Sequence, residues 1–500
     1  MRIDLDYHYL THHVVPGPQS LSYFVSLLLL PIALLIPRSI LSRRHSIFIF
    51  VPIILAASIH AWYSIGGPDV ISVDVPLWCL FLLALNDPWT DFRRIVNPQS
   101  RPSSGRIHQA TFSTESLPEV PTGIPAVKAN SHIGEQTALI EGPGDDEPAS
   151  SAPSSDEGED SCEIEEQSYP GSLWQRLPWV GTLLVSIRLN NWKIGSYSHD
   201  RSQPAPPAFK SRGSFLIYSI ISFIRGYLVL DLTRAYISTD SYFVTTKGNP
   251  SVPINAPLPP HLPSLFRSLV PPQLFRTMII GAQAWALISQ MFYLPCLLPV
   301  LLHSLGWITD EWSPHNWPPY FGSPGTILHH GVRGFWGQYW HQTMRFSVSG
   351  PGYALASWLK LRRDGLWRYA IITLVAFGLS GIVHMGLVPP EPPHATVPVN
   401  SVRLLVAGFF WVQPIAMLVE VATARAIASN MGLNQWQAGN GLRLRITLNF
   451  IWVIVWFTIC LPLIGEAGRQ LGYWRVWPMP ISVWKGLRGE GWLTWPFLMN

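Results

Sequence analysis

Residues 333–345 read RGFWGQYWHQTMR and gather aromatic, cationic and imidazole side chains in one short stretch. If the stretch is helical, His341 and Arg345 lie four residues apart on one face, and Trp336 and Trp340 are spaced in the same way. A neutral imidazole can take up a proton near neutral pH, and a guanidinium can bind a phosphate. Trp and Tyr also gather at membrane surfaces, so the tryptophans alone fit an aromatic belt. A belt requires no imidazole, which makes His341 a candidate for chemistry.

A second histidine lies inside an apolar run. The sequence FGLSGIVHMGLVPP places His384 within the 22 uncharged residues Tyr369–Pro390. An ionisable side chain inside a membrane helix is costly and is therefore a functional candidate. Ser380 and Gly381 precede it by four and three residues and form a small-residue face that another helix or a substrate chain can approach closely. The structural alternative is a histidine whose hydrogen bonds are satisfied by a neighbouring helix.

Other polar groups are weaker candidates. Glu420 and Gln413 lie in the apolar stretch WVQPIAMLVEVATA, where we expect helix packing first and cavity lining second. His329 and His330 are adjacent, but no third ligand stands at a recognisable spacing, so no metal site is predicted. The sequence has no Gly-x-Ser-x-Gly elbow, no phosphate-binding Gly-x-x-x-x-Gly-Lys loop and no His-Glu-x-x-His zinc helix. The candidate chemistry that remains is general-base catalysis by a histidine in a lipid-embedded cavity.

The elements that must position these residues are membrane helices. Of the 500 residues, 48% are hydrophobic and 13% are charged, which is about half the charged share of a typical soluble domain. Most of the uncharged runs approach the roughly 20 residues that cross a bilayer. The runs are Ser20–Pro37, Ser46–Pro68, Thr277–Thr309, Tyr369–Pro390, Leu404–Val419 and Ile446–Gly465, with Ser214–Leu230 and Val75–Asn86 as weaker candidates. The sequence thus predicts an all-α polytopic bundle of about seven to nine transmembrane helices that encloses a catalytic cavity.

Charge divides the chain into parts. Residues 141–166 carry 11 acidic residues and no basic one, whereas the rest of the chain carries 19 acidic and 34 basic residues. Basic residues beside the apolar runs can all share the cytosolic side if residues 346–359 enter the membrane and return. We expect transmembrane helices in 1–86, a largely disordered acidic cytosolic insertion with an interfacial amphipathic end in 87–212, and the catalytic membrane domain in 213–500.

A known family combines these motifs. WPPYFGSP at Trp317–Pro324, FWGQYWHQ at residues 335–342 and His384, which follows His341 by 43 residues, resemble the wax-synthase-like branch of the membrane-bound O-acyltransferases. In that family a membrane histidine matched by His384 is held to activate the acceptor hydroxyl. The position matched by His341 is asparagine in sterol and diacylglycerol acyltransferases and commonly histidine in this branch.

The whole chain most resembles fungal members that acetylate terpenoid or meroterpenoid alcohols in secondary-metabolite pathways. The resemblance implies transfer of an acyl group, here acetyl, from acyl-CoA to a hydroxyl of a hydrophobic acceptor. It also implies no bound cofactor, no metal and no nucleic acid, with acyl-CoA, the alcohol and the lipid bilayer as partners. We expect a multi-pass protein of the endoplasmic reticulum membrane.

The chemistry of acyl transfer assigns roles to these residues. A thioester is already activated, so the enzyme needs a base near the alcohol, donors for the developing oxyanion and two substrates held in line. We assign His384 as the general base and His341 to the reacting carbonyl. The expected substrate- and CoA-binding residues are Arg333, Trp336, Trp340, Gln342 and Arg345. The two arginines suit the phosphates of CoA, and a phospholipid headgroup would suit them equally.

Alternatives remain open from the sequence. A long-chain wax-ester or sterol acyltransferase would use the same motifs. A proton-coupled transporter would use His384, Glu420 and Gln413 as a relay, and a non-catalytic scaffold would use the acidic insertion for docking. A span that starts at Tyr369 puts His384 about 22 Å along its helix at roughly 1.5 Å per residue. Because His341 is expected near the cytosolic surface, the sequence does not decide whether both histidines act on one centre.

Overall fold

The computed structural model describes residues 21–64, 70–96, 165–186, 188–189, 192–194, 209, 211–244, 252–308, 312–314, 317, 319–392, 395–431 and 439–495. Contacts divide the chain into one unit formed by Met1–Ile95 and Glu166–Asn500 and a second unit, Val96–Glu165. Only the two end residues of the second unit are described. The disorder expected for residues 97–164 therefore lies outside the described residues.

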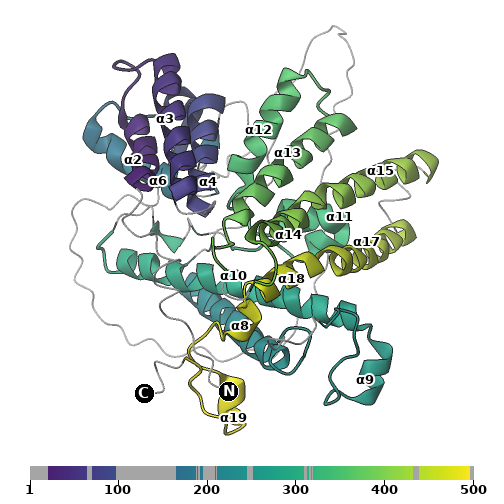
Figure 1. Ribbon diagram of the computed structural model, residues 1–500. Helices are drawn as coiled ribbons and strands as arrows, with labels where there is room; N and C mark the ends of the chain where they lie inside the picture. The colour runs from purple at the N-terminus through teal and green to yellow at the C-terminus, as the bar shows by residue number, and fades with distance from the viewer. Residues whose placement is uncertain are drawn as a thin grey trace, which may run out of the picture. The chain divides into compact units, whose positions relative to one another are not determined.

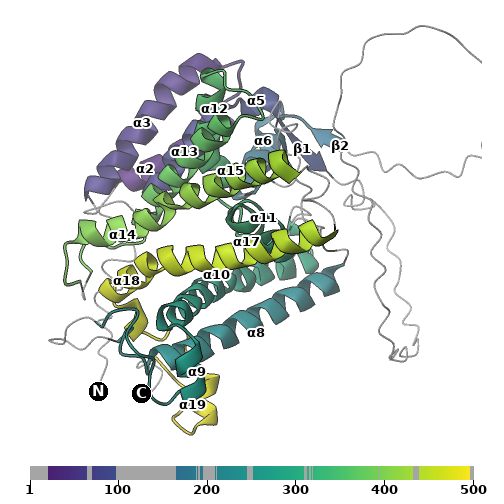
Figure 2. The same ribbon diagram turned by 90° about the vertical axis from the view of Figure 1, so that its right-hand side faces the viewer.

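Helices make up most of the described chain (Figures 1 and 2). The longer helices are α2 (Leu21–Leu35), α3 (Arg43–Ser64), α4 (Val70–Cys79) with the π-helix η1 (Leu80–Leu85), α6 (Leu173–Val185), α8 (Arg212–Ile237), α10 (Pro272–Ser304), α11 (Gly325–Gly334), α12 (Arg345–Trp358), α13 (Leu366–Met385), α14 (Val399–Trp411), α15 (Gln413–Met431), α17 (Gly439–Cys460) and α18 (Pro462–Gln470). Short elements are α5 (Pro88–Asp91), α9 (Ser264–Leu269), η5 (Phe335–Tyr339), η6 (Tyr473–Arg475) and α19 (Val483–Leu487).

The predicted all-α membrane architecture is confirmed. Six helical segments of the described chain are long and apolar enough to cross a bilayer, and two shorter apolar helices, Leu21–Leu35 and Val70–Leu85, accompany them. The predicted number of seven to nine is reached only when these shorter helices are included. The six long segments are Arg43–Trp62, Arg212–Ile237, Pro272–Ser304, Leu366–Met385, Val399–Ile427 and Gly441–Gln470.

The outward faces of these helices are apolar. On α8 the side chains of Ile217, Ile221, Ile224, Leu228 and Leu232 follow one another at helical spacing and are 47% to 61% exposed. An apolar stripe of this kind would be unfavourable in water, but it matches the hydrocarbon interior of a bilayer. The helix therefore turns one stripe toward lipid and packs the opposite side against α10.

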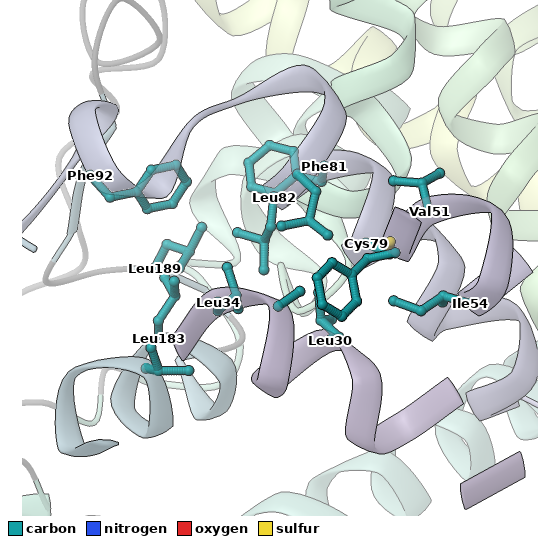
Figure 3. Close-up of a cluster of buried hydrophobic side chains, with 14 of the residues drawn as sticks. Leu30, Leu34, Val51, Ile54, Cys79, Phe81, Leu82, Phe92, Leu183 and Leu189 are labelled. Atoms are coloured by element: carbon teal, nitrogen blue, oxygen red, sulfur yellow. The ribbon is translucent and has the colours of Figure 1, made fainter. Parts of the chain in front are cut away.

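The N-terminal helices share a core with the segment that follows the acidic insertion (Figure 3). Leu183 of α6 and Leu189 lie beside Leu34 of α2, and all three are buried. A small sheet with the strand order β2-β1-β3 borders this core, formed by β1 (Phe92–Val96), β2 (Glu165–Gln167) and β3 (Trp192–Ile194). The sequence did not predict this sheet, because strands of three to five residues are too short to show a clear alternation.

The helices around the two histidines each pack against two or more neighbours (Figure 1). Helix α13 lies against α12 and α14, and α11 lies against α15 and α17. Residues 345–358 form the single helix α12, which contains Pro351. Gly352 permits the close approach of α12 to α13, because a Cβ there would lie 2.9 Å from Ile372 Cα.

Candidate active site

A break in α11 sets the direction of the aromatic segment. Gly331 has a φ of +64°, in the left-handed region that favours glycine. The N–H groups of Val332 and Arg333 then donate to Glu420 Oε1 and Oε2, at 2.6 and 2.9 Å. A Cβ at residue 331 would lie 2.3 Å from Glu420 Oε1, so the contact also needs a glycine. Glu420 of α15 thus caps a broken helix, which is the packing role expected first for it.

The predicted continuous helix over residues 334–345 is wrong. The π-helix η5 ends at Tyr339, and Trp340 leaves helical geometry with a ψ of 151°. Helix α12 then begins at Arg345. His341 consequently lies in the turn between two helices, and it does not share a helical face with Arg345.

Gln342 closes this turn. Its Nε2 donates to the backbone carbonyls of Trp336 and Trp340, at 2.9 and 2.6 Å. These donors replace the N–H groups that a further helical turn would have supplied, which explains why the helix can end here. Its Oε1 lies 3.5 Å from Arg345 Nη1. Because both amide hydrogens of Gln342 are engaged, this side chain orders the turn.

The motifs WPPYFGSP and FWGQYWHQ contact each other at Gly322. Its N–H donates to the carbonyl of Tyr339 at 2.8 Å, and a Cβ at this position would lie 2.2 Å from the carbonyl oxygen of Gln338. The neighbouring Phe321 ring lies 5.6 Å from Tyr339 and 5.4 Å from Trp340, measured between ring centroids. Segment 320–323 is therefore docked on η5 by a backbone hydrogen bond and by aromatic contacts.

His341 is held by neighbours on both motifs. Its Nδ1 lies 2.8 Å from Thr343 Oγ1, and its ring stacks on Tyr320 with 5.6 Å between centroids and 14° between planes. Trp340 lies on another side at 5.6 Å. With Nδ1 occupied by Thr343, Nε2 is the ring nitrogen that remains for a substrate.

His384 is held by a hydrogen bond to its own helix. Its Nδ1 lies 2.7 Å from the backbone carbonyl of Ser380, one helical turn earlier in α13. A carbonyl can only accept, so Nδ1 carries the proton and Nε2 has the free lone pair. The ring stacks on Phe410 of α14, with 3.9 Å between centroids. The helix that carries His384 therefore presents it as a proton acceptor in one fixed tautomer.

Burial and neighbouring charges affect the titration of His341. Burial, together with the charges of His384 and Arg188, lowers the pKa of His341 to about 3. His341 is therefore neutral at physiological pH. The break in α11 at Gly331 and the end of η5 at Tyr339 determine where the chain places His341.

Trp336 forms part of the surrounding framework. Its Nε1–H donates to Gln413 Oε1 at 3.0 Å, and Trp456 Nε1–H donates to the same oxygen at 2.9 Å. Gln413 is fully buried, and its Nε2 also donates to the carbonyl of Phe409 at 2.6 Å. Gln413 thus has the packing role expected first for it, and Trp336 supplies an aromatic wall with no free N–H.

Arg333 and Arg345 lie in different local environments. Arg333 follows the break in α11 and its side chain is exposed, whereas Arg345 begins α12 and is half-buried. The rings of His329 and His330 are 6.4 Å apart. Within the described residues no group of three His, Cys, Asp or Glu side chains could hold a metal ion.

Gly381 is the position of closest approach between α13 and α14. A Cβ there would lie 2.4 Å from Trp411 Nε1, whereas a Cβ at Gly378 in the same helix would meet nothing within 4 Å. The small-residue face predicted before His384 thus packs against another helix, α14.

We expect Gly381→Ala to force α13 and α14 apart and to lower the yield of monodisperse protein several-fold, at a cost of about 1–3 kcal/mol for overpacking. Gly378→Ala is the matched control and should leave the detergent size-exclusion profile unchanged. Equal profiles for both variants would contradict the close approach described here.

Several residues of the site carried no sequence signal of their own. Tyr320 and Thr343 lie inside or beside the quoted motifs, but neither was singled out, because a role for them depends on the docking of segment 320–323. Arg188 lies in the expected interfacial segment and reaches Tyr320 across 132 residues of sequence. Nothing in local spacing predicts such a contact.

Taken together, the long apolar helices and their outward-facing apolar side chains are those of an integral membrane protein. The sequence model of the membrane bound O-acyl transferase family matches residues 317–391, from the docked segment to just beyond His384. Over these residues the chain is similar to the membrane-bound O-acyltransferases, which agrees with the resemblance seen in the sequence.

Curated relatives agree with this assignment. The chain is 25% identical to acetyltransferase eriL of Hericium erinaceus over 326 residues, which cover 64% of this chain and 74% of eriL. It is 45% identical to acetyltransferase nanB of Aspergillus nanangensis over 74 residues, 15% of this chain and 17% of nanB. It is 25% identical to acetyltransferase ataH of Aspergillus terreus over 262 residues, 51% of this chain and 77% of ataH. No solved structure matches the chain.

Proposed function

We propose that this protein transfers an acetyl group from acetyl-CoA to a hydroxyl of a hydrophobic acceptor, such as a terpenoid or meroterpenoid alcohol of fungal secondary metabolism. One observation carries the proposal: His384 donates through Nδ1 to the Ser380 carbonyl and so keeps Nε2 as a base within electrostatic reach of His341. The acetyltransferase names of the curated relatives support the choice of acyl group. We place the protein in the endoplasmic reticulum membrane.

The proposed reaction starts at the acceptor alcohol. His384 Nε2 takes the hydroxyl proton while the alcohol oxygen attacks the thioester carbonyl carbon. The tetrahedral intermediate then collapses, the carbon–sulfur bond breaks, and the proton passes from His384 to the sulfur of CoA. The products are the ester and free CoA, so neither a metal nor a covalent acyl-enzyme takes part in the proposed steps.

Hydrogen bonding in the membrane region favours an enzyme over a transporter. A proton relay would need His384, Glu420 and Gln413 to exchange protons with one another. Glu420 is instead occupied by two backbone N–H groups, and Gln413 is occupied by two indole N–H groups. Glu420 and Gln413 are thus engaged in holding neighbouring helices and aromatic side chains.

The proposal can be tested with microsomes or detergent-purified protein. Labelled acetyl-CoA is offered with a panel of terpenoid alcohols, sterols and long-chain alcohols, and each is also offered with palmitoyl-CoA. We expect label in the esters of the terpenoid alcohols. Transfer only from palmitoyl-CoA, or only to long-chain alcohols or sterols, would favour a wax-ester or sterol acyltransferase, and no transfer to any alcohol would overturn the proposal.

A separate prediction concerns the binding of CoA. If Arg333 and Arg345 hold its phosphates, changing either to alanine should raise KM for acetyl-CoA by about 10-fold, as expected for the loss of a charge-assisted contact of about 1.5 kcal/mol, and should leave KM for the alcohol nearly unchanged. The KM effect should shrink at high salt. The exposed Arg362, whose guanidinium pairs with Asp364, provides the matched Arg→Ala control. Equal increases in both KM values would contradict the assignment to CoA.

A further inference from the structure

Arg188 connects the segment that follows the acidic insertion to the active site. Its Nη1 donates to the carbonyl of Pro319 at 2.8 Å, and its Nη2 donates to the carbonyl of Tyr320. The guanidinium carbon also lies 5.1 Å from the centroid of the Tyr320 ring. Arg188 follows α6, whose side chains are built into the N-terminal core. The position of Tyr320 therefore depends on a distant part of the chain.

Tyr320 is in turn placed against His341. Its ring stacks on Phe292, with 4.1 Å between centroids and 21° between planes, and on His341, with 5.6 Å and 14°. Thr343 contacts the same imidazole, with its Oγ1 2.8 Å from His341 Nδ1. Contacts thus run from Arg188 through Tyr320 to the imidazole, which Thr343 also contacts.

We propose that Arg188, Tyr320 and Thr343 are positioning residues that hold His341 with its proton on Nε2, as the hydrogen-bond donor to the thioester carbonyl. In this arrangement the Thr343 hydroxyl donates to His341 Nδ1, and the Tyr320 ring supports the imidazole by stacking on it. A neutral imidazole has one N–H, so accepting at Nδ1 leaves the proton on Nε2. The inference rests on the proposed function and deepens it.

The arrangement gives the two histidines complementary roles. His384 donates through Nδ1 to a carbonyl and offers a lone pair at Nε2, whereas His341 accepts at Nδ1 and offers an N–H at Nε2. The first suits the removal of a hydroxyl proton, and the second suits the oxygen on which negative charge develops. The depressed pKa of His341 agrees with this role, because only the neutral ring has a defined donor and acceptor side.

The tautomer can be observed directly and without reference to activity. In protein labelled with ¹⁵N-histidine, His341 is identified by the resonance that disappears in His341→Asn. We expect wild type and Thr343→Ser to show the Nε2–H form, and the isosteric Thr343→Val to show a mixture of forms. An Nδ1–H form in wild type, or a spectrum that Thr343→Val leaves unchanged, would overturn the proposal.

Hydrogen exchange tests the contribution of Arg188. The Gly322 amide, bonded to Tyr339 O, reports the docking of the segment that Arg188 holds. We expect peptides that contain Gly322 to exchange faster in Arg188→Met than in wild type, and Arg188→Lys to lie between them. Unchanged exchange in Arg188→Met would refute the role of Arg188. If exchange and tautomer follow expectation but no alcohol is acetylated, only the proposed function fails.

Kinetics distinguish positioning from general stability. We expect Thr343→Val to lower kcat by about 10–100-fold, a fraction of the effect of losing an oxyanion donor outright, with KM for acetyl-CoA changed less than about threefold. Thr343→Ser should recover most of the rate. In a His341→Ala background, Thr343→Val should have no further effect, because the residue acts only through the imidazole. Effects that multiply in the double variant would contradict the proposal.

Discussion

His384→Ala should lower kcat by about 10²–10⁴-fold, the usual contribution of a general base, while the protein still inserts and binds acetyl-CoA. The free Nε2 of His384 is the proposed proton acceptor, and the Nδ1–H bond to the Ser380 carbonyl fixes that tautomer. Alanine removes the acceptor but leaves α13 and its packing in place. The measurement is kcat per correctly folded molecule, normalised by the detergent size-exclusion profile.

His384→Gln separates catalysis from packing. The glutamine amide can still donate to the Ser380 carbonyl, but it cannot take up a proton near neutral pH. We therefore expect this variant to be nearly as inactive as His384→Ala, whereas the exposed His329→Ala should retain wild-type turnover. If His384→Gln retains more than about a tenth of wild-type kcat, His384 is not the base, because loss of a general base costs more than that. The mechanism would then fail, and His341 would be the next candidate.

The second large effect is expected at His341. His341→Ala should lower kcat by about 10²–10³-fold, the effect of removing one donor to a developing oxyanion. His341→Asn should retain more of the rate, because the asparagine amide still offers an N–H group. If asparagine and alanine are equally inactive, a donor role is contradicted.

The pH dependence provides an independent check on this role. Because burial and the neighbouring charges lower the pKa of His341 to about 3, the ring loses its proton at a lower pH than an ordinary histidine. His341 is then neutral throughout pH 5–8 in the folded protein. We expect His341→Asn to reduce kcat/KM at every pH in this interval without moving the acidic midpoint. A shifted midpoint would show that His341 titrates during the reaction.

The sequence by itself predicted the membrane helices and the two candidate histidines. Apolar runs predict membrane helices because the period and length of such runs are local properties. The Nδ1–H of His384 is also local, since its partner is the carbonyl four residues earlier in the same helix. The motif that carries the histidines could likewise be found from the sequence.

Only the tertiary structure decided how His341 enters the site. The aromatic stretch looks helical by spacing, yet Gln342 satisfies the carbonyls at the end of η5 and allows the chain to leave the helix at Trp340. Glu420 stabilises the break at Gly331 from another helix, 88 residues away. Arg188 places Tyr320 from 132 residues away, and this long-range contact depends on how the helices pack, which the local spacing of residues does not encode.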